Sequence, residues 1–178
     1  MNYYKQKQFI AKIDRKGNII GKIEKWEAHR KGVLHKALTV AIIYKGQYIL
    51  QHRKHPAFDG VLDLTSSSHQ IYINNKLQTT EEATYECLKR EWGLSKKDFI
   101  GKLRNDGAIY YKARDLKSGF TEHEVCEMLT IKIKKLPTPD FDYAYGFSLV
   151  TKKQLLDKRG RIYGSLAPWV KKMLHKLS

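Results

Sequence analysis

One segment of the sequence limits the fold more than any other. Residues 37–44, ALTVAIIY, are apolar on both faces of a strand, and QYILQHR at 47–53 follows across a Lys-Gly turn. A strand with two apolar faces has to be covered on both sides, which is typical of a sheet packed between helices. The sequence therefore predicts a hairpin whose first strand is central in a covered sheet.

The covering helices are indicated by their end signals. Thr79 and Glu82 have capping-box spacing and Gly93 provides a stop, which predicts a helix at about 80–92. Pro168 begins a basic helix expected at about 167–177, and Thr151 with Gln154 caps a shorter one. Alternation predicts a hairpin at about 8–25 and strands at 107–113, 124–135 and 145–150. Strands interspersed with few helices predict the α/β class with a mixed sheet.

Length and charge limit the organisation and the partners. A chain of 178 residues, 42% apolar, is expected to form a single domain over 1–178. With 34 Lys+Arg against 18 Asp+Glu, the formal charge is +16, which favours polyanions or phosphorylated substrates. The lysines are scattered and no basic tract is interleaved with aromatic residues, so a nucleic-acid partner is not expected. The sequence does not fix the oligomeric state.

The cysteines and the apolar runs indicate the compartment. Cys87 and Cys126 are the only cysteines and have no paired spacing, which disfavours a disulfide framework and a zinc ribbon. No apolar run is long enough for a secretory signal or a membrane span. We therefore expect a cytoplasmic protein with no membrane partner.

Several segments carry side chains that could bind a metal. His29 and His35 flank RKGVL, and His69 ends the run SSSH. Glu122 and Glu124 share one face of a strand, roughly 7 Å apart, where two carboxylates either face solvent or share a cation. Three histidines with two carboxylates suit Mg²⁺, Mn²⁺ or a transition metal better than a thiolate zinc site. Spacing alone leaves the metal site and the solvated alternative open.

Two further features call for an explanation. Glu91 lies on the same helix face as Cys87 and Leu88, so its carboxylate needs a partner, either a nearby lysine or a functional one. The serines of LDLTSSSHQ lack the strand-turn-helix GxSxG context of a nucleophilic serine. A serine nucleophile is therefore disfavoured.

Four segments, taken in order, resemble the type I isopentenyl-diphosphate isomerases, a branch of the Nudix superfamily. They are GKIEKWEAHRKGVLHKALTV, GVLDLTSSSHQ, EATYECLKREWGL and TEHEV, and the similarity runs from about Phe9 to Leu174. The resemblance implies a Nudix-type α/β/α sandwich. It also implies an enzyme of isoprenoid biosynthesis that depends on Mg²⁺ or Mn²⁺, with Zn²⁺ as a further candidate. Such an enzyme shifts a double bond in a small diphosphate substrate by adding one proton and removing another.

The resemblance also assigns roles to residues. By motif position, one metal would be held by His29, His35, His69, Glu122 and Glu124, and Glu91 would bind a second Mg²⁺ that bridges to the diphosphate. Lys25 and Arg53 would bind the diphosphate, and Glu122 with Tyr111 would transfer a proton. Trp169 would shield a carbocation, a role that suits the face of an indole ring.

The main departure from the family is at the catalytic cysteine, whose place is taken by Ser67. A serine hydroxyl is a far weaker acid than a thiol, whose pKa is about 8.5, and needs a base beside it to transfer a proton at neutral pH. Leu62, Asp63 and Leu64 replace the family's Trp-Thr-Asn, and Cys87 replaces a substrate-binding arginine.

Two alternatives to an isomerase remain open. A Nudix hydrolase of nucleoside or prenyl diphosphates normally uses the glutamates of an R-E-U-x-E-E-x-G-U helix, and ECLKREWGL keeps only Glu91 of the three that bind metal. A protein that binds a diphosphate without turning it over is the second alternative.

Overall fold

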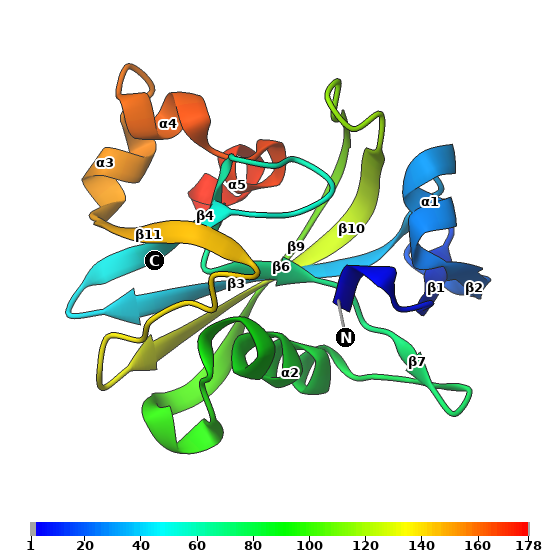
Figure 1. The fold of residues 1–178 in the computed structure, drawn as a ribbon, viewed down its shortest axis with the longest axis horizontal. Helices are drawn as coiled ribbons and strands as arrows, with labels where there is room; N and C mark the ends of the chain where they lie inside the picture. The colour runs from blue at the N-terminus through cyan, green and yellow to red at the C-terminus, as the bar shows by residue number, and fades with distance from the viewer. Residues whose placement is uncertain (1–2, 178) are drawn as a thin grey trace.

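A large mixed sheet with helices on both faces forms the body of the molecule (Figure 1). The computed structural model describes residues 3–177, so Met1, Asn2 and Ser178 of the expected domain lie outside it. The strands of the large sheet are β1 (Phe9–Ile13), β2 (Ile19–Glu24), β3 (His35–Tyr44), β4 (Gln47–Arg53), β5 (Leu62–Leu64), β6 (Ser66–Ser68), β9 (Phe99–Arg114), β10 (Thr121–Ile133) and β11 (Ala144–Val150). Strands β7 (Tyr72–Ile73) and β8 (Lys76–Leu77) form a separate ribbon. The expected α/β class is confirmed.

The helices are short except for one. They are α1 (Lys25–Lys31), α2 (Thr80–Trp92), α3 (Lys152–Leu156), α4 (Arg161–Ser165) and α5 (Pro168–Met173), with 3₁₀ turns η1 (Tyr3–Lys5), η2 (Lys96–Asp98) and η3 (Leu174–Lys176). Helix α2 lies below the sheet in Figure 1, and α3, α4 and α5 lie above it. Among residues 3–177, no helix has the length and hydropathy that a transmembrane helix requires.

Strand β3 is central, as expected, but its hairpin with β4 is present only at the turn. The two strands pair at Ile43 with Tyr48 and at Tyr44 with Gln47. Strand β6 then occupies that edge of β3, while β4 turns away to pair with β5 and β11. The other edge of β3 pairs in parallel with β10, which makes the sheet mixed. This divergence places the serine run beside the centre of the sheet.

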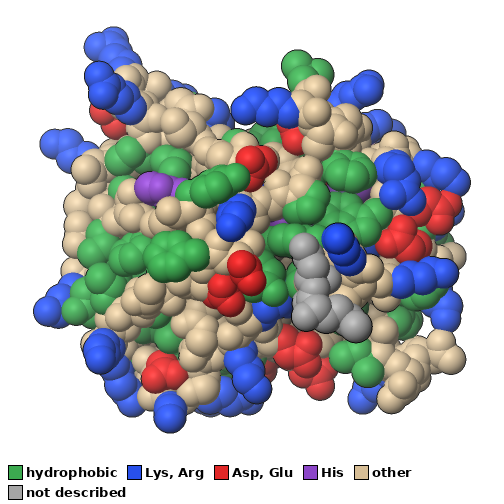
Figure 2. Space-filling model, viewed as in Figure 1, with side chains coloured by type: hydrophobic (Ala, Val, Ile, Leu, Met, Phe, Trp, Pro, Cys, Tyr) green, Lys and Arg blue, Asp and Glu red, His purple; other side chains and the backbone are tan. Residues whose placement is uncertain are grey.

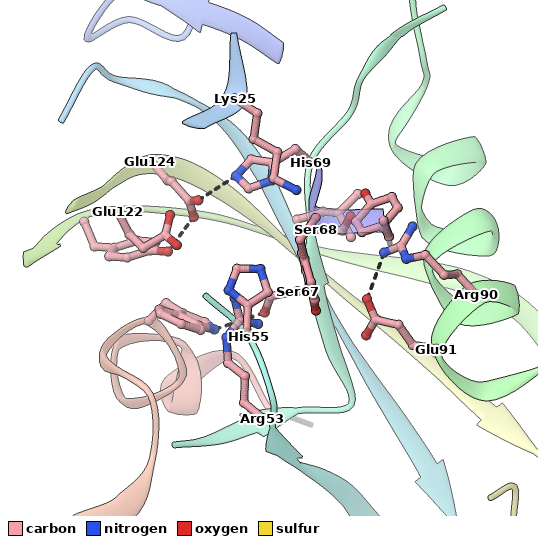
Figure 3. A pocket seen from close by; sticks show the side chains of 15 residues that line it. Lys25, Arg53, His55, Ser67, Ser68, His69, Arg90, Glu91, Glu122 and Glu124 are labelled. Carbon is pink, nitrogen blue, oxygen red and sulfur yellow. Dashed lines mark hydrogen bonds and ion pairs between the residues drawn. The ribbon is translucent and has the colours of Figure 1, made fainter. Parts of the chain in front are cut away.

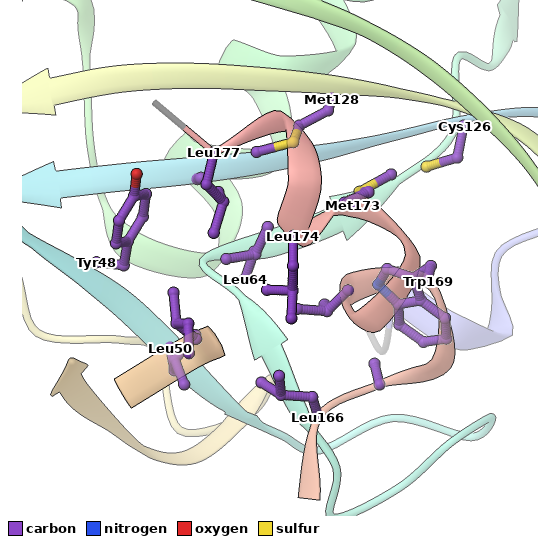
Figure 4. Packing of buried hydrophobic residues seen from close by; sticks show 14 of the residues in the cluster. Tyr48, Leu50, Leu64, Cys126, Met128, Leu166, Trp169, Met173, Leu174 and Leu177 are labelled. Carbon is purple, nitrogen blue, oxygen red and sulfur yellow. The ribbon is translucent and has the colours of Figure 1, made fainter. Parts of the chain in front are cut away.

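The two faces of β3 pack into different cores, which explains its apolar pattern. Leu38, Val40 and Ile42 belong to the core that contains Leu88 and Trp92 of α2. Successive residues of a strand point to opposite faces, so Ala37 and Ala41 belong to the other core, together with residues of α5. Figure 4 shows Trp169, Met173 and Leu174 of this second core packed near Leu64 and Met128.

Local signals fix the ends of α2, whereas the C-terminal helix differs from expectation. Thr79 and Glu82 form the capping box, and Gly93 ends α2 in the left-handed conformation at φ 63°. The C-terminal α-helix ends at Met173 rather than near 177, and η3 follows as a tighter turn that buries Leu174. Strand β9 begins at Phe99 instead of 107, and β10 spans Thr121–Ile133 instead of 124–135.

Helix α1 was not expected from the sequence, although it carries candidate site residues. The carboxylate of Glu24 accepts hydrogen bonds from the backbone N–H groups of Trp26 and Glu27, and Gly32 ends the helix at φ 61°. Glutamate is not among the usual N-cap residues, so the start signal is weak in the sequence. The helix places Lys25 and His29 one turn apart on the same face.

The charged side chains of one face are spread widely. Figure 2 shows Lys and Arg side chains around the outline of this face, with Asp and Glu side chains among them. On the face shown, the positive charge is therefore distributed rather than gathered in one basic patch.

Candidate active site

Five candidate metal ligands from separate segments converge in the interior. One possible ligand atom from each lies within 4.8 Å of every other. They come from α1, the start of β3, the residue after β6, and β10: His29, His35, His69, Glu122 and Glu124. The structure therefore brings together all five residues that the sequence analysis placed at one metal.

The register of β3 and β10 explains part of this convergence. Glu124 lies opposite His35 in the parallel pair, so the two side chains project from neighbouring strands on the same face. The expected alternation along β10 is present: Glu122 and Glu124 are buried at the cluster, whereas His123 contacts Tyr110 and the Gly32 carbonyl. Figure 3 shows Glu122 and Glu124 on the same side of the pocket.

Backbone carbonyls orient two of the imidazole rings. Nδ1 of His29 lies 2.6 Å from the Lys25 carbonyl oxygen, and Nδ1 of His35 lies 2.7 Å from that of Val33. Because a carbonyl only accepts, both Nδ1 atoms carry hydrogen, and each Nε2 is directed to the carboxylates. Nε2 of His29 and Oε2 of Glu122 are buried and, within residues 3–177, have no hydrogen-bond partner. Two such atoms are the expected donors to a cation.

The spacing of the donor atoms fits a single divalent cation. Nε2 of His29 is 2.9 Å from Oε2 of Glu122, and Oε1 of Glu124 is 3.3 Å from Nε2 of His35 and 3.1 Å from that of His69. Bonds of about 2.1 Å to an octahedral ion place adjacent ligand atoms about 3 Å apart. The mixed imidazole and carboxylate set suits Mn²⁺, Mg²⁺ or Zn²⁺.

Electrostatics favour the protonation states that metal binding requires at three of these residues. Burial raises the pKa of Glu122 and Glu124, but hydrogen bonds and charge from His29 and His35 hold both below the ordinary value, so both carboxyls are ionised. Burial lowers the pKa of His69 well below its usual value, and the charges of His35 and His29 lower it further. His69 is therefore neutral at pH 7.

Beside the cluster is a pocket with several basic side chains in its wall. Lys25, Arg53, His55 and Arg90 line it together with Ser67 and Glu91 (Figure 3). The sequence analysis predicted Lys25 and Arg53 as diphosphate-binding residues, but it missed His55 and Arg90. His55 lies in the loop KHPAFDG, and no local signal distinguishes it from an ordinary loop residue.

Lys25 is held in a buried, aromatic environment. Its Nζ lies 4.8 Å from the centre of the Trp26 ring and 4.9 Å from that of Tyr3, and it donates a hydrogen bond to Gln8 Oε1. Burial, reinforced by the charge of Arg90, lowers the pKa of Lys25 to about 8. The amine is thus cationic at neutral pH but close to titration.

Arg53 is already paired inside the protein. Its Nη1 donates to Oδ2 of Asp63 at 3.1 Å, and its guanidinium lies 5.3 Å from the centre of the Trp169 ring. Asp63 was overlooked as a site residue, although an acid between Leu62 and Leu64 in a strand was a visible signal. Arg53 therefore reaches the pocket wall with its charge partly balanced by a buried carboxylate.

The partner that Glu91 requires is Arg90 rather than a lysine. Nη2 of Arg90 lies 2.8 Å from Oε1 of Glu91, and Oε2 accepts hydrogen bonds from Ser66 Oγ at 2.8 Å and Gln51 Nε2 at 3.2 Å. Arg90 also stacks on Tyr3, with its Cζ 3.9 Å from the ring centre. Glu91 lies in the pocket wall but outside the five-residue cluster.

The remaining predicted residues, Ser67, Tyr111 and Trp169, lie together in the pocket wall. Ser67 Oγ lies 3.0 Å from both Asp63 Oδ1 and Trp169 Nε1. The Tyr111 hydroxyl donates to Glu124 at 2.5 Å, not to Glu122, with which the resemblance paired it. The ring centres of Tyr111 and Trp169 are 5.9 Å apart.

Known proteins resemble this chain in part of its sequence and, separately, in its fold. No protein-family model matches the chain. An isopentenyl-diphosphate Delta-isomerase of Rhodobacter capsulatus is 31% identical over 127 residues, covering 68% of this chain and 66% of that protein. The corresponding protein of Jannaschia sp. is 32% identical over 110 residues, covering 60% and 56%. The chain thus spans less than two thirds of these relatives' lengths.

Solved structures extend the likeness over most of the chain. A protein of Deinococcus radiodurans has a TM-score of 0.67 at 13% identity and covers 94% of this chain and 98% of its own. A MutT Nudix hydrolase of Burkholderia pseudomallei has a TM-score of 0.60 at 15% identity, covering 82% and 98%. The chain is therefore a Nudix-fold protein. Within that fold, its sequence places it as similar to the isopentenyl-diphosphate isomerases.

Proposed function

We propose that this protein is a metal-dependent enzyme of diphosphate compounds, and that its reaction is the double-bond shift of an isopentenyl-diphosphate isomerase. The observation that carries the proposal is the cluster of three histidines and two glutamates with mutual distances of 4.8 Å or less, next to a pocket lined by cationic side chains. The sequence likeness to isomerases supports the same reaction.

The chain's own residues account for binding and orientation. Lys25 and Arg90 contribute positive charge to the pocket wall, where they would bind the diphosphate oxygens. His29, His35, His69, Glu122 and Glu124 would hold a divalent cation, whose charge would offset that of the diphosphate. We assign the stabilisation of a positively charged carbon to Trp169 and Tyr111, which both line the pocket and whose ring centres are 5.9 Å apart.

The two carboxylates of β10 are suited to different tasks. Glu124 is engaged by the Tyr111 hydroxyl and by two histidines, which fixes its position. Glu122 pairs with His29 at 2.9 Å, and its Oε2 has no hydrogen-bond partner in the described residues. We therefore assign to Glu122 the transfer of a proton to the substrate, a proton that this ionised carboxylate first takes up from solvent, and we assign the orientation of Glu122 to the surrounding cluster.

A Nudix hydrolase is the weaker alternative on structural grounds. Ordinary pyrophosphate cleavage uses several metal ions held by glutamates of the helix. Glu91, the one glutamate of that motif present here, is bound by Arg90, Ser66 and Gln51. A second metal at Glu91 would have to compete with the Arg90 guanidinium.

The test follows isopentenyl diphosphate in D₂O with Mg²⁺ and Mn²⁺, using NMR to detect deuterium entry and dimethylallyl diphosphate. We expect slow exchange and product formation by the natural protein, and their loss in Glu122→Gln. The matched control is His123→Ala, on the same strand but facing away from the cluster.

Three other outcomes would overturn the isomerase. Absence of exchange in both the natural protein and Ser67→Cys would exclude the reaction. Release of phosphate or a nucleoside monophosphate from a substrate panel would indicate the hydrolase. Metal-dependent binding of inorganic diphosphate without any product would indicate a binding protein.

A further inference from the structure

Asp63 and Ser67 form a hydrogen-bonded pair that leads from the pocket into the interior. Ser67 lines the pocket and donates from Oγ to Oδ1 of Asp63 at 3.0 Å. Asp63 itself is completely buried and is not part of the pocket lining. A proton could therefore reach Asp63 from a substrate through Ser67.

Three donors hold the Asp63 carboxylate in place. Arg53 donates to Oδ2 at 3.1 Å, and the Trp169 indole donates to Oδ1 at 2.8 Å, while Ser67 provides the third hydrogen bond. Burial raises the pKa of Asp63 to about 6, although the charge of Arg53 lowers it. The group is thus ionised at neutral pH, yet it accepts a proton more readily than an exposed aspartate.

The hydroxyl of Ser67 has the freedom that a relay needs. Thr39 Oγ1 lies 2.8 Å from Ser67 Oγ and 3.4 Å from the Cys126 thiol, so its hydrogen can be directed to either one. The Trp169 N–H is likewise shared between Asp63 and Ser67. When Thr39 donates to Cys126, one lone pair of Ser67 is left without a donor, and rotation of the hydroxyl can then direct it to the pocket.

We propose that Asp63 and Ser67 together form the base that removes the substrate proton, in place of a single thiolate. The inference rests on the proposed isomerase function. A serine hydroxyl alone cannot hold an extra proton, but it can accept one while passing its own to a neighbouring carboxylate. A hydrogen next to a carbocation is strongly acidic, so a weak base of this kind is sufficient.

The step balances in atoms and charge. The C–H bond at C2, next to the cationic carbon, breaks, and its electron pair forms the new double bond. The hydrogen forms an O–H bond at Ser67 Oγ, while the original hydroxyl hydrogen moves to Asp63 Oδ1. The reacting carbon changes from cationic to neutral and Asp63 from anionic to neutral, so one positive charge moves from the substrate to Asp63. After product release, the proton returns along the same path to the solvent.

In this scheme Asp63 acts only through Ser67, so it is a positioning and proton-storing residue. The competing explanation is that Asp63 serves solely to pair with Arg53 and Trp169 and so to connect β4, β5 and α5. A purely structural role predicts that the loss caused by an Asp63 change is the same whichever side chain stands at position 67. The relay predicts that the loss depends on that side chain.

The experiment compares Ser67→Ala, Asp63→Asn, Ser67→Cys and the double variant Ser67→Cys/Asp63→Asn in D₂O. Ser67→Ala and Asp63→Asn should form dimethylallyl diphosphate about 10² to 10⁴-fold more slowly. Deuterium should still enter C4 of isopentenyl diphosphate, because protonation there is reversible and does not use the relay. In the Ser67→Cys background, Asp63→Asn should cost less than about 10-fold, since a thiolate holds the proton alone.

The KM of Ser67→Ala and of Asp63→Asn should stay within about two-fold of the natural value. The control is Asp14→Asn, in the exposed turn after β1, which should keep the natural rate. Equal losses in the two backgrounds, or natural isomerisation by Ser67→Ala, would overturn the relay. Ser67→Ala keeps the Asp63–Arg53 pair intact, so it gives an answer even where Asp63→Asn does not fold. If the proposed isomerase function itself is wrong, the result is different, because no deuterium then enters C4 in any variant.

Discussion

Nε2 of His29 and Oε2 of Glu122 lie 2.9 Å apart in the interior, and neither has a hydrogen-bond partner within residues 3–177. The hydrogen of a neutral His29 is placed on Nδ1 by the Lys25 carbonyl, so two lone pairs face each other. Such an arrangement is favourable only with a proton or a cation between them.

Replacement of Glu122 should therefore remove a metal ion. We expect the natural protein to retain about one Mn²⁺ per chain after dialysis, measured by elemental analysis, and Glu122→Gln to retain far less. Saturation at 100 times Kd should stabilise the natural fold by about 2.7 kcal/mol in thermal unfolding, and a chelator should reverse this gain. Equal metal content in Glu122→Gln and in the outward-facing control His123→Ala would contradict the assignment.

Substitution of Ser67 by cysteine should increase the rate of isomerisation. A thiolate takes up the proton in a single transfer, whereas the Ser67 hydroxyl must pass a proton on to Asp63, and the thiolate is also a stronger base than that carboxylate, whose pKa is about 6. General acid–base catalysis as a whole contributes about 10² to 10⁴-fold, which limits the gain. The measurement is kcat for dimethylallyl diphosphate formation. Ser148→Cys, at a position whose hydroxyl contacts His52 outside the pocket, is the control and should leave kcat unchanged. A Ser67→Cys rate equal to the natural one would contradict this prediction.

Diphosphate affinity should fall as the pH rises above 8. The pKa of Lys25 is lowered to about 8, first by burial and then by Arg90, so its amine is cationic below that pH and neutral above it. A bound anion favours the cation, so affinity is constant below pH 8 and falls by up to about 10-fold per unit above it. Calorimetric titration with inorganic diphosphate at pH 7 and 9 measures the difference.

Lys25→Arg provides the comparison, because a guanidinium stays charged throughout this range. The variant should bind diphosphate equally well at pH 7 and 9, apart from any gain as the diphosphate itself loses protons. The exposed Lys22→Arg should retain the natural pH dependence. If the diphosphate affinity of Lys25→Arg falls between pH 7 and 9 as much as that of the natural protein, a group other than Lys25 is responsible for the pH dependence.

Shortening Met173 should destabilise the fold. Met173 is fully buried in the core that also contains Trp169 and Met128, so Met173→Ala leaves a cavity. We expect the free energy of unfolding in urea to decrease by about 2 to 5 kcal/mol. Lys172→Ala, exposed on the same helix, should change it by less than about 0.5 kcal/mol. Similar midpoints for the two variants would contradict this role for the C-terminal helix.

Local signals made part of the structure predictable. Thr79, Glu82 and Gly93 define α2 because a helix end depends on a few neighbouring residues. The alternation in TEHE indicated that Glu122 and Glu124 share a face, and the structure has them there. The resemblance to a known family, not spacing, joined them with the three histidines.

Long-range partners account for what the sequence did not predict. Asp63 meets the Trp169 indole 106 residues away, and no local pattern connects the two. The splaying of β3 from β4 depends on β6 pairing with β3, which a hairpin signal does not include. The Arg90–Glu91 ion pair involves adjacent residues, but its position in the pocket wall follows only from how α2 packs.

The parallel pairing of Glu124 with His35 also has a consequence for folding. Parallel strands far apart in the sequence form late, because a long loop must close first. A slip of one residue between β3 and β10 would turn Glu124 to the opposite face and separate it from His35 and His69. A cation bound by these residues therefore stabilises only the native register of β3 and β10. Besides its proposed place in the reaction, the metal would favour the correct alignment of these two strands during folding.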